Sequence, residues 1–198
     1  MDVITAHCCP VANEDIVFQA RLDSNGNLVS DGYGISYVTN EVEQYVANLF
    51  SENGLDTQIN FGCLGKEAGE LSNLDLTDED LLTTAFGYDV FFGGNIAVRD
   101  TGSMEDMAAI IYRIVNEVMV DNNPARMRFG IFIVGDADYD ACVEEMRKYD
   151  SVSELFFRNY DTKGLVSVWI NKEENEGINM TEEEILQKLE EEVNEFYR

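Results

Sequence analysis

The strongest pattern along the chain is a nearly continuous apolar run at residues 127–134, which is rich in β-branched and aromatic side chains. A run this short and this apolar is typical of a strand that is buried on both faces. Asp136, Asp138 and Asp140 follow Gly135, and apolar residues then recur at helical spacing. The pattern predicts a strand, a tight turn and a helix, with carboxylates at the carboxyl end of the strand, where open α/β sheets bind ligands.

Shorter or alternating apolar segments predict further strands before and after this run. The Asn25-Gly26 step favours a tight hairpin turn. Gly93 and Gly94 interrupt another apolar segment, which predicts a strand pair or a bulged strand there. The expected strands are residues 16–22, 28–38, 56–63, 88–98, 154–160 and 165–171, with a hairpin joining the last two.

Capping residues mark the starts of the other expected helices. Ser103 precedes a wide apolar face, which predicts the longest internal helix, packed against the sheet. Gly54 and Gly87 stand where the first two of these helices are expected to end. The expected N-caps are Asn40, Thr77, Ser103 and Thr181, with Glu43, Asp106 and Glu184 at reciprocal positions.

This order of strands and helices predicts one compact domain over residues 1–198, with an irregular course allowed for residues 1–14. Neither an internal repeat nor a linker divides the chain. The expected fold class is α+β or α/β, a mixed β-sheet packed with about four to five helices.

The charge of the chain is its most unusual property. It has 39 acidic residues against 13 lysines and arginines, a formal net charge of −26. The acids occur along the whole chain and are not confined to a tail. A field of this sign repels nucleic acid and anionic membranes and attracts basic surfaces.

Targeting and redox patterns favour a cytoplasmic location. The first residues lack the basic start and apolar core of a secretory signal, and no apolar stretch approaches the roughly 18 residues of a membrane span. Four scattered cysteines fit a reducing compartment better than a disulfide scaffold. We therefore expect neither a membrane nor direct contact with nucleic acid.

Asp136 and Asp138 carry the best enzymatic alternative. Carboxylates two residues apart after a strand can hold Mg²⁺ together with substrate phosphates. An EF-hand is excluded, because Ala141 replaces its glycine and Arg147 replaces its bidentate acid. Aspartates are also common at helix starts, where they cap the helix and complement its dipole. We favour the interpretation that these aspartates cap the helix, so no metal or cofactor is expected.

His7, Cys8 and Cys9 invite a zinc interpretation, with Cys63 or Cys142 as a fourth ligand. Adjacent cysteines lack the spacing of structural zinc sites, and the chain has a single histidine. Buried or tolerated thiols are the favoured interpretation. A single histidine near the start also gives little support to a catalytic triad.

Acidic helix faces are the candidate partner-binding surfaces. Neighbours three or four residues apart on a helix lie about 5–6 Å from each other, close to the spacing of phosphates along a nucleic-acid strand. A solvated face is the alternative for any one helix. The candidates are Asp78, Glu79 and Asp80 in the turn after Thr77, and Glu184, Glu191 and Glu195 on the last helix.

In composition and size, though in no motif, the chain is similar to acidic inhibitors that imitate nucleic acid, such as phage anti-restriction and anti-CRISPR proteins. It is equally similar to acidic immunity proteins that block basic nuclease toxins. The resemblance implies a non-enzymatic protein that occludes a basic, nucleic-acid-binding partner. A net charge of −26 exceeds the ~2–8 charges that solubility asks of a small domain.

Three alternatives remain open. The first is a metal-dependent enzyme that acts on a phosphate ester through Asp136 and Asp138. The second is a structural subunit whose acidity only keeps it soluble. The third is adaptation to high salt, which favours acids over lysine, although the chain's asparagine and cysteine content is unlike that bias.

Overall fold

The computed structural model describes residues 4–11, 16–121, 124, 126–149, 152–171 and 178–191. Its main element is a four-stranded sheet in the order β4-β5-β6-β7. β5 and β6 are parallel, and the two outer pairs are antiparallel. The strands are β4 (Thr57–Gly65), β5 (Val90–Arg99), β6 (Arg126–Val134) and β7 (Thr162–Asn171). The chain thus has an α+β fold with a mixed sheet, as the sequence predicts.

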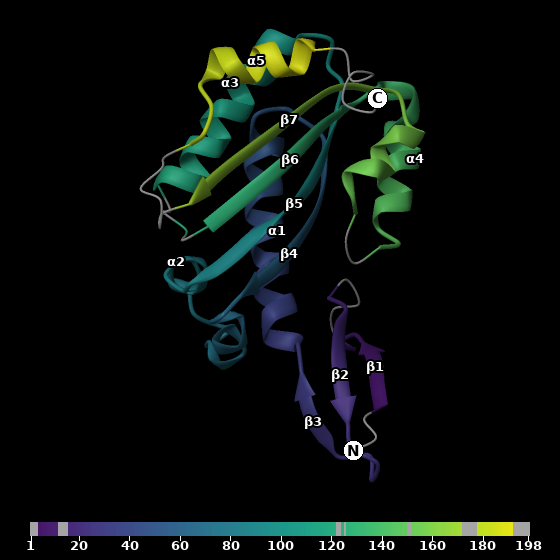
Figure 1. Ribbon diagram of the computed structural model, residues 1–198, viewed down its shortest axis with the longest axis vertical. Helices are drawn as coiled ribbons and strands as arrows, with labels where there is room; N and C mark the ends of the chain where they lie inside the picture. The colour runs from purple at the N-terminus through teal and green to yellow at the C-terminus, as the bar shows by residue number, and fades with distance from the viewer. Residues whose placement is uncertain are drawn as a thin grey trace.

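A second, three-stranded antiparallel sheet is formed by the amino-terminal part of the chain. Its strands are β1 (Ile4–Cys8), β2 (Phe18–Leu22) and β3 (Leu28–Asp31), in that order. The expected hairpin turn joins β2 to β3, with Gly26 at φ +83°. Figure 1 shows this sheet extending away from the four-stranded sheet, beyond the first turn of α1 (Tyr33–Glu52).

Helices cover both faces of the four-stranded sheet (Figure 1). Alternate residues of β6 supply the two cores: Phe129 and Ile131 pack with α1, α3 and α5, whereas Phe132 and Val134 pack with α4 and η3. β6 is therefore buried on both faces from Phe129 to Val134, which confirms the prediction for the run at 127–134 apart from the exposed Arg128. The helices after α1 are η1 (Ala68–Asn73), α2 (Leu81–Phe86), α3 (Met104–Val115), the π-helical η2 (Asn116–Asp121), α4 (Asp136–Met146), the 3₁₀ helix η3 (Glu154–Asn159) and α5 (Glu182–Glu190).

The first helix begins earlier than its expected cap at Asn40, and it replaces the second half of the expected strand at residues 28–38. Asp31 Oδ1 accepts the Tyr33 N–H at the helix start. Tyr33 and Tyr37 lie one turn apart, and Phe18 of β2 packs edge-on to Tyr33 at 5.4 Å. This aromatic packing overrides the strand propensity of the segment. α1 spans 20 residues and α3 spans 12, so the prediction that the helix after Ser103 is the longest internal helix is also wrong.

Three other local predictions are corrected. Residues 77–80 form turns before α2, and Asp80 rather than Thr77 precedes its first residue. Val90–Arg99 form one continuous strand where a strand pair or a bulged strand was expected at 88–98, since Gly94 lets β4 approach: a Cβ there would lie 2.0 Å from the Asn60 carbonyl oxygen. Glu154–Asn159 form η3 where a hairpin strand was expected at 154–160, because Phe157 stacks on Phe132 of the sheet at 3.7 Å.

Other helix signals are confirmed in part. Ser103 accepts the Asp106 N–H at the start of α3, which is half of the expected box, and Thr181 and Glu184 form a complete capping box on α5. Glu43, expected to complete a box with Asn40, accepts the Phe61 N–H of β4 instead. α1 ends just before Gly54, which has φ +77°. No helix within the described ranges is long and apolar enough to cross a membrane.

Candidate functional site

The candidate site lies at the carboxyl ends of β5 and β6, where the two parallel strands end side by side. Arg99 is the last residue of β5, and Asp136 is the first residue of α4, two positions after β6. The Asp100 N–H donates to the Val134 carbonyl at 2.9 Å and so continues the strand pairing past Arg99. This backbone pairing places the Arg99 side chain beside the start of α4.

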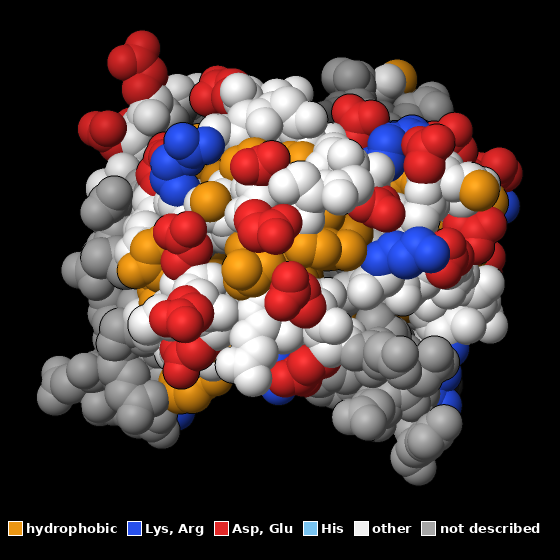
Figure 2. Space-filling view, turned by 90° about the horizontal axis from the view of Figure 1, so that it is seen from above, with side chains coloured by type: hydrophobic (Ala, Val, Ile, Leu, Met, Phe, Trp, Pro, Cys, Tyr) orange, Lys and Arg blue, Asp and Glu red, His pale blue; other side chains and the backbone are white. Residues whose placement is uncertain are grey.

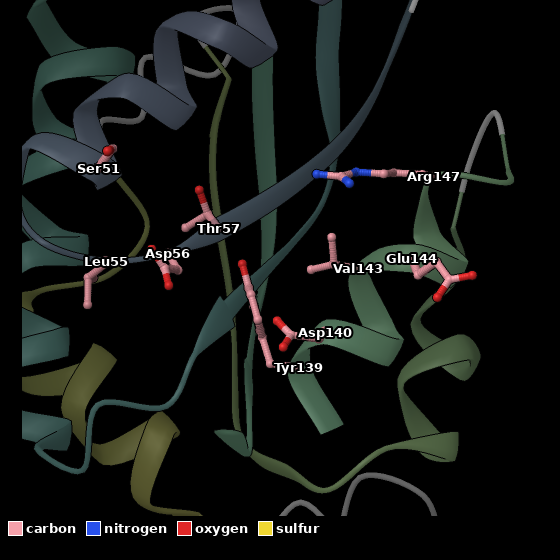
Figure 3. A pocket seen from close by; sticks show the side chains of 9 residues that line it. All are labelled: Ser51, Leu55, Asp56, Thr57, Tyr139, Asp140, Val143, Glu144 and Arg147. Atoms are coloured by element: carbon pink, nitrogen blue, oxygen red, sulfur yellow. The ribbon is translucent and has the colours of Figure 1, made fainter. Parts of the chain in front are cut away.

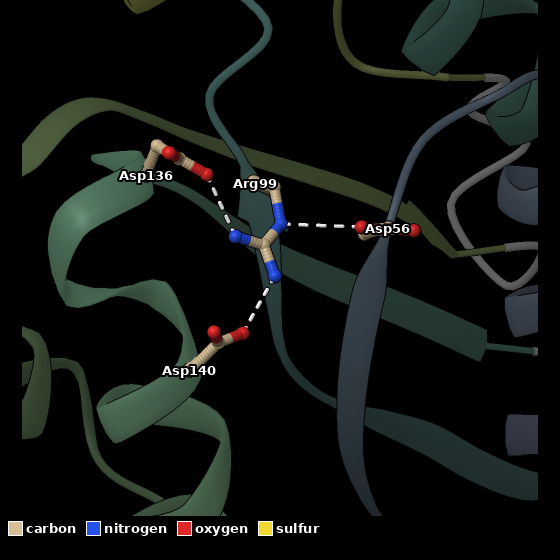
Figure 4. A network of polar contacts seen from close by, with 4 residues as sticks. All are labelled: Asp56, Arg99, Asp136 and Asp140. Atoms are coloured by element: carbon tan, nitrogen blue, oxygen red, sulfur yellow. Dashed lines mark hydrogen bonds and ion pairs between the residues drawn. The ribbon is translucent and has the colours of Figure 1, made fainter.

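Three carboxylates surround the Arg99 guanidinium, and we call these four residues the Arg99 cluster (Figure 4). Nε donates to Asp56 Oδ2 at 3.1 Å, Nη1 to Asp136 Oδ1 at 2.7 Å and Nη2 to Asp140 Oδ1 at 2.6 Å. The guanidinium carbon also lies 4.3 Å from the centre of the Tyr139 ring. One cation therefore ties together the segment before β4, the end of β5 and the first turns of α4.

The cluster combines fixed geometry with exposure to solvent. The side chain of Arg99 is 26% exposed, whereas those of Asp56, Asp136 and Asp140 are 73%, 77% and 86% exposed. Hydrogen bonds to Asp136 and then Asp140 raise the pKa of Arg99 above its usual value, so the guanidinium stays charged. The carboxylates are held on one side and open to water on the other.

Asp138 has a different role from its neighbours. Its Oδ2 accepts the Asp161 N–H at 2.8 Å, and the Gly135 N–H donates to the Asp161 carbonyl at 2.7 Å. Gly135 lets the two segments approach closely, because a Cβ there would lie 2.7 Å from Asp161 Oδ2 and 3.2 Å from the Asp161 carbonyl oxygen. Asp138 thus fastens the turn before β7 to the start of α4.

These contacts bear on the two candidate metal ligands. Asp136 and Asp138 do not converge on a common point: one binds Arg99 and the other binds a backbone N–H. The guanidinium occupies the position between the carboxylates that a cation would need. Within the described ranges, no group of three or more histidine, cysteine or acidic side chains is placed to hold a metal ion.

A cleft of about 450 Å³ opens beside the Arg99 cluster, and we call it the α4 cleft (Figure 3). One wall is the end of α1 and the start of β4, and the other is the side of α4 that carries Tyr139, Asp140 and Val143. Its polar lining includes Asp56, Thr57, Tyr139, Asp140, Glu144 and Arg147. Arg147 is held at the cleft by Gln58, whose Oε1 accepts its Nε–H at 3.0 Å.

The predicted acidic surfaces lie elsewhere. Asp78, Glu79 and Asp80 are exposed, as expected, but they precede α2 at the amino end of β5, opposite Arg99. Glu184 is exposed, and its carboxylate closes the capping box with Thr181. Glu191 is partly buried and pairs with Lys188 at 2.7 Å, whereas Glu195 lies outside the described residues.

Figure 2 shows the face of the molecule that is at the top in Figure 1. Acidic side chains surround exposed apolar atoms over much of this face. Lysine and arginine side chains are fewer and lie among the acids. The face therefore reflects the excess of acids in the whole chain.

The cysteines do not come together. Cys8 and Cys9 lie at the end of β1, Cys63 is on β4, and Cys142 is buried on α4. Burial raises the pKa of the Cys63 and Cys142 thiols to about 12, so both are protonated at neutral pH. They have the character of core thiols rather than of reactive groups.

The sequence drew attention to Asp136 and Asp140 but missed Arg99, Asp56 and Tyr139. One signal was available: Arg99 is an isolated base directly after an apolar strand, in an otherwise acidic segment. Its partners could not be read from spacing, because Asp56 lies 43 residues before it and Asp136 lies 37 residues after it.

Comparisons with known proteins support the fold alone. No protein-family model matches the chain, and no curated protein matches it in sequence. The structure is similar to the crystal structure of a DUF5037 family protein from Ruminococcus gnavus, with a TM-score of 0.60 and 12% sequence identity. The match covers 95% of this chain and 84% of that protein. The two chains therefore share a fold.

Proposed function

We propose that the protein is a non-enzymatic binding protein that occludes the nucleic-acid-binding surface of a basic partner. The Arg99 cluster carries the proposal, because its carboxylates are exposed yet held in place by one guanidinium. A binding surface that is already ordered loses less conformational entropy when the partner arrives. The cluster would present fixed negative charges to lysine and arginine side chains that otherwise bind phosphates.

The composition supports this proposal. With 39 acids and 13 bases, most acids lack a base of their own even if every base pairs with one of them. The three acids that bind Arg99 share a single positive charge. Such an excess repels itself and destabilises the compact state. A basic partner would relieve this repulsion.

The Arg99 cluster is a better candidate than the two acidic surfaces expected from the sequence. Glu184 and Glu191 already serve α5, the first in its capping box and the second in an ion pair. The turn at residues 78–80 is exposed, but Asp78 Oδ1 is held by the Asp80 N–H of the same turn, whereas Arg99 joins carboxylates from two separate segments. We propose the cluster as the main contact and retain the 78–80 turn as the surface for comparison.

The mechanism would be competition. Carboxylates in a lysine- and arginine-lined groove replace phosphates, and association is then fast and sensitive to salt. Arg99→Met separates this mechanism from a mere effect of net charge. The substitution makes the protein more acidic, so an effect of net charge alone predicts tighter binding. Loss of the ordered carboxylates predicts weaker binding.

The first experiment is capture of host proteins on the immobilised chain at low salt, elution at high salt and identification by mass spectrometry. Each captured protein is then tested by fluorescence anisotropy for release of bound nucleic acid when the acidic protein is added. The expected result is a nucleic-acid-binding partner that releases its nucleic acid. Captured proteins that keep their nucleic acid, or that stay bound at high salt, would contradict the proposal.

A further inference from the structure

We infer that the α4 cleft receives one arginine or lysine side chain of the basic partner. This inference rests on the proposed function, and it assigns the cleft a ligand of stated chemistry. The argument depends on the hydroxyl of a largely buried tyrosine, which lines the cleft, and on two carboxylate oxygens in its walls.

Tyr139 supplies the first observation. Its side chain lies under the Arg99 guanidinium and only 5% of the residue is exposed, yet no described residue hydrogen-bonds its hydroxyl. Figure 3 shows this hydroxyl pointing into the cleft, toward Asp56 and Thr57. Most of the side chain is buried, and the hydroxyl reaches the surface of the cleft, where a ligand or water can bond to it. A hydroxyl in this position can accept a hydrogen bond from a cation.

The carboxylates supply the second observation. Asp56 uses Oδ2 and Asp140 uses Oδ1 to hold Arg99. Among the described residues nothing bonds to the other oxygen of either side chain, Asp56 Oδ1 or Asp140 Oδ2. Both residues line the cleft together with Tyr139. The cluster thus fixes each carboxylate through one oxygen and leaves the second oxygen available.

The free acceptors of the cleft then select the ligand. Asp56, Asp140 and Glu144 are negative and Arg147 at the edge is positive, while Arg99 pairs with both aspartates and Lys148 pairs with Glu144 at 3.2 Å. The selection therefore depends on the two aspartate oxygens that Arg99 does not bind. Guanidinium and ammonium groups carry several N–H donors and no acceptor, which suits acceptors that converge in this way. Arg147 and the Thr57 hydroxyl are donors, and they are suited to main-chain carbonyls that flank the inserted side chain.

The test uses N-acetyl-arginine amide as the probe and N-acetyl-citrulline amide as its neutral isostere. The full chain, labelled with ¹⁵N, is titrated with each compound, and the shifts of the backbone amides are followed by NMR. We expect the arginine probe to shift the amides of Thr57, Tyr139 and Asp140 in a saturable manner. The citrulline probe should bind at least about tenfold more weakly, because it lacks the charge.

Tyr139→Phe is the decisive variant, because it removes only a hydroxyl that has no described partner and keeps the ring under Arg99. We expect about tenfold weaker binding of the arginine probe, with the dispersion of the spectrum unchanged. Tyr160→Phe is the matched control: the Tyr160 hydroxyl donates to Glu145 of α4, and Tyr160 does not line the cleft. This control should bind the probe as the wild type does.

Unchanged affinity in Tyr139→Phe, equal binding of the citrulline probe, or shifts spread over all acidic surfaces would overturn the inference. These results leave the proposed function standing if a basic partner is still captured and displaced from nucleic acid. Saturable binding of arginine in the cleft without any such partner would instead remove the proposed function.

Discussion

Glu43 links the stability of this acidic protein to pH. It lies on α1, and its Oε1 accepts the N–H of Phe61 at 2.6 Å. Phe61 belongs to β4, an edge strand, so the carboxylate satisfies a backbone group that faces away from the sheet. Burial raises the pKa of Glu43 from 4.5 to about 7, and the hydrogen bond from Phe61 opposes this only in part.

The direction of the effect follows from linkage. Because the folded-state pKa is raised, the native state holds a proton between pH 4.5 and about 7 that the unfolded chain has lost. The stability associated with this proton is complete below the unfolded pKa and is lost as the pH rises through the folded pKa. At about 1.4 kcal/mol per pKa unit, the full loss is about 3 kcal/mol.

Glu43→Gln removes the charge and keeps an oxygen that can accept the Phe61 N–H. The variant should therefore be more stable than the wild type, and its advantage should grow by about 2 kcal/mol from about pH 5 to pH 8. Urea denaturation at several pH values measures this difference. The lowest pH of this series, about 5, stays above the sequence pI of about 4.1, where a protein without net charge tends to precipitate.

Glu52→Gln is the matched control, because it removes an exposed carboxylate from the end of the same helix. Its free energy of unfolding should differ from that of the wild type by a similar amount at every pH. The reasoning about burial would be refuted if the stability gained by Glu43→Gln were the same at every pH, or if this variant were less stable than the wild type at pH 8.

Two further comparisons test the fold. Ile131→Ala, at a fully buried position, should cost about 2–5 kcal/mol in urea denaturation, whereas Leu155→Ala, 58% exposed, should change stability by less than about 0.5 kcal/mol. Gly94→Ala should be severely destabilising, because the new Cβ would lie 2.0 Å from the Asn60 carbonyl oxygen. Gly62→Ala should unfold in a cooperative transition like that of the wild type, because its Cβ would meet only the Gly93 carbonyl oxygen, at 4.0 Å. Equal losses within either pair would contradict the packing described here.

The sequence predicts those elements whose local pattern and tertiary burial agree. β6 is apolar on both faces because both faces are covered, and the caps at Ser103 and Thr181 are local devices that act within one turn. These elements could be located from the sequence to within one or two residues.

Elements that depend on distant contacts could not be located in this way. The start of α1 depends on the packing of Tyr33 against Phe18, and η3 depends on Phe157 stacking against Phe132. In both segments the aromatic residues suggest a strand by propensity, but they are used for packing between elements. The Arg99 cluster was missed for the same reason, since its acids come from two separate segments.

The measurement that tests the central claim most directly compares two triple variants for association with the captured basic partner. One replaces Asp56, Asp136 and Asp140 with Asn, and the other replaces Asp78, Glu79 and Asp80 with Asn, Gln and Asn, so both lose three charges. We predict that the first variant associates much more slowly than the second at low salt, and that the difference disappears as the Debye length falls to ~3 Å at 1 M salt. Equal association rates for the two variants, or an affinity of the wild type that does not change with salt, would contradict the account.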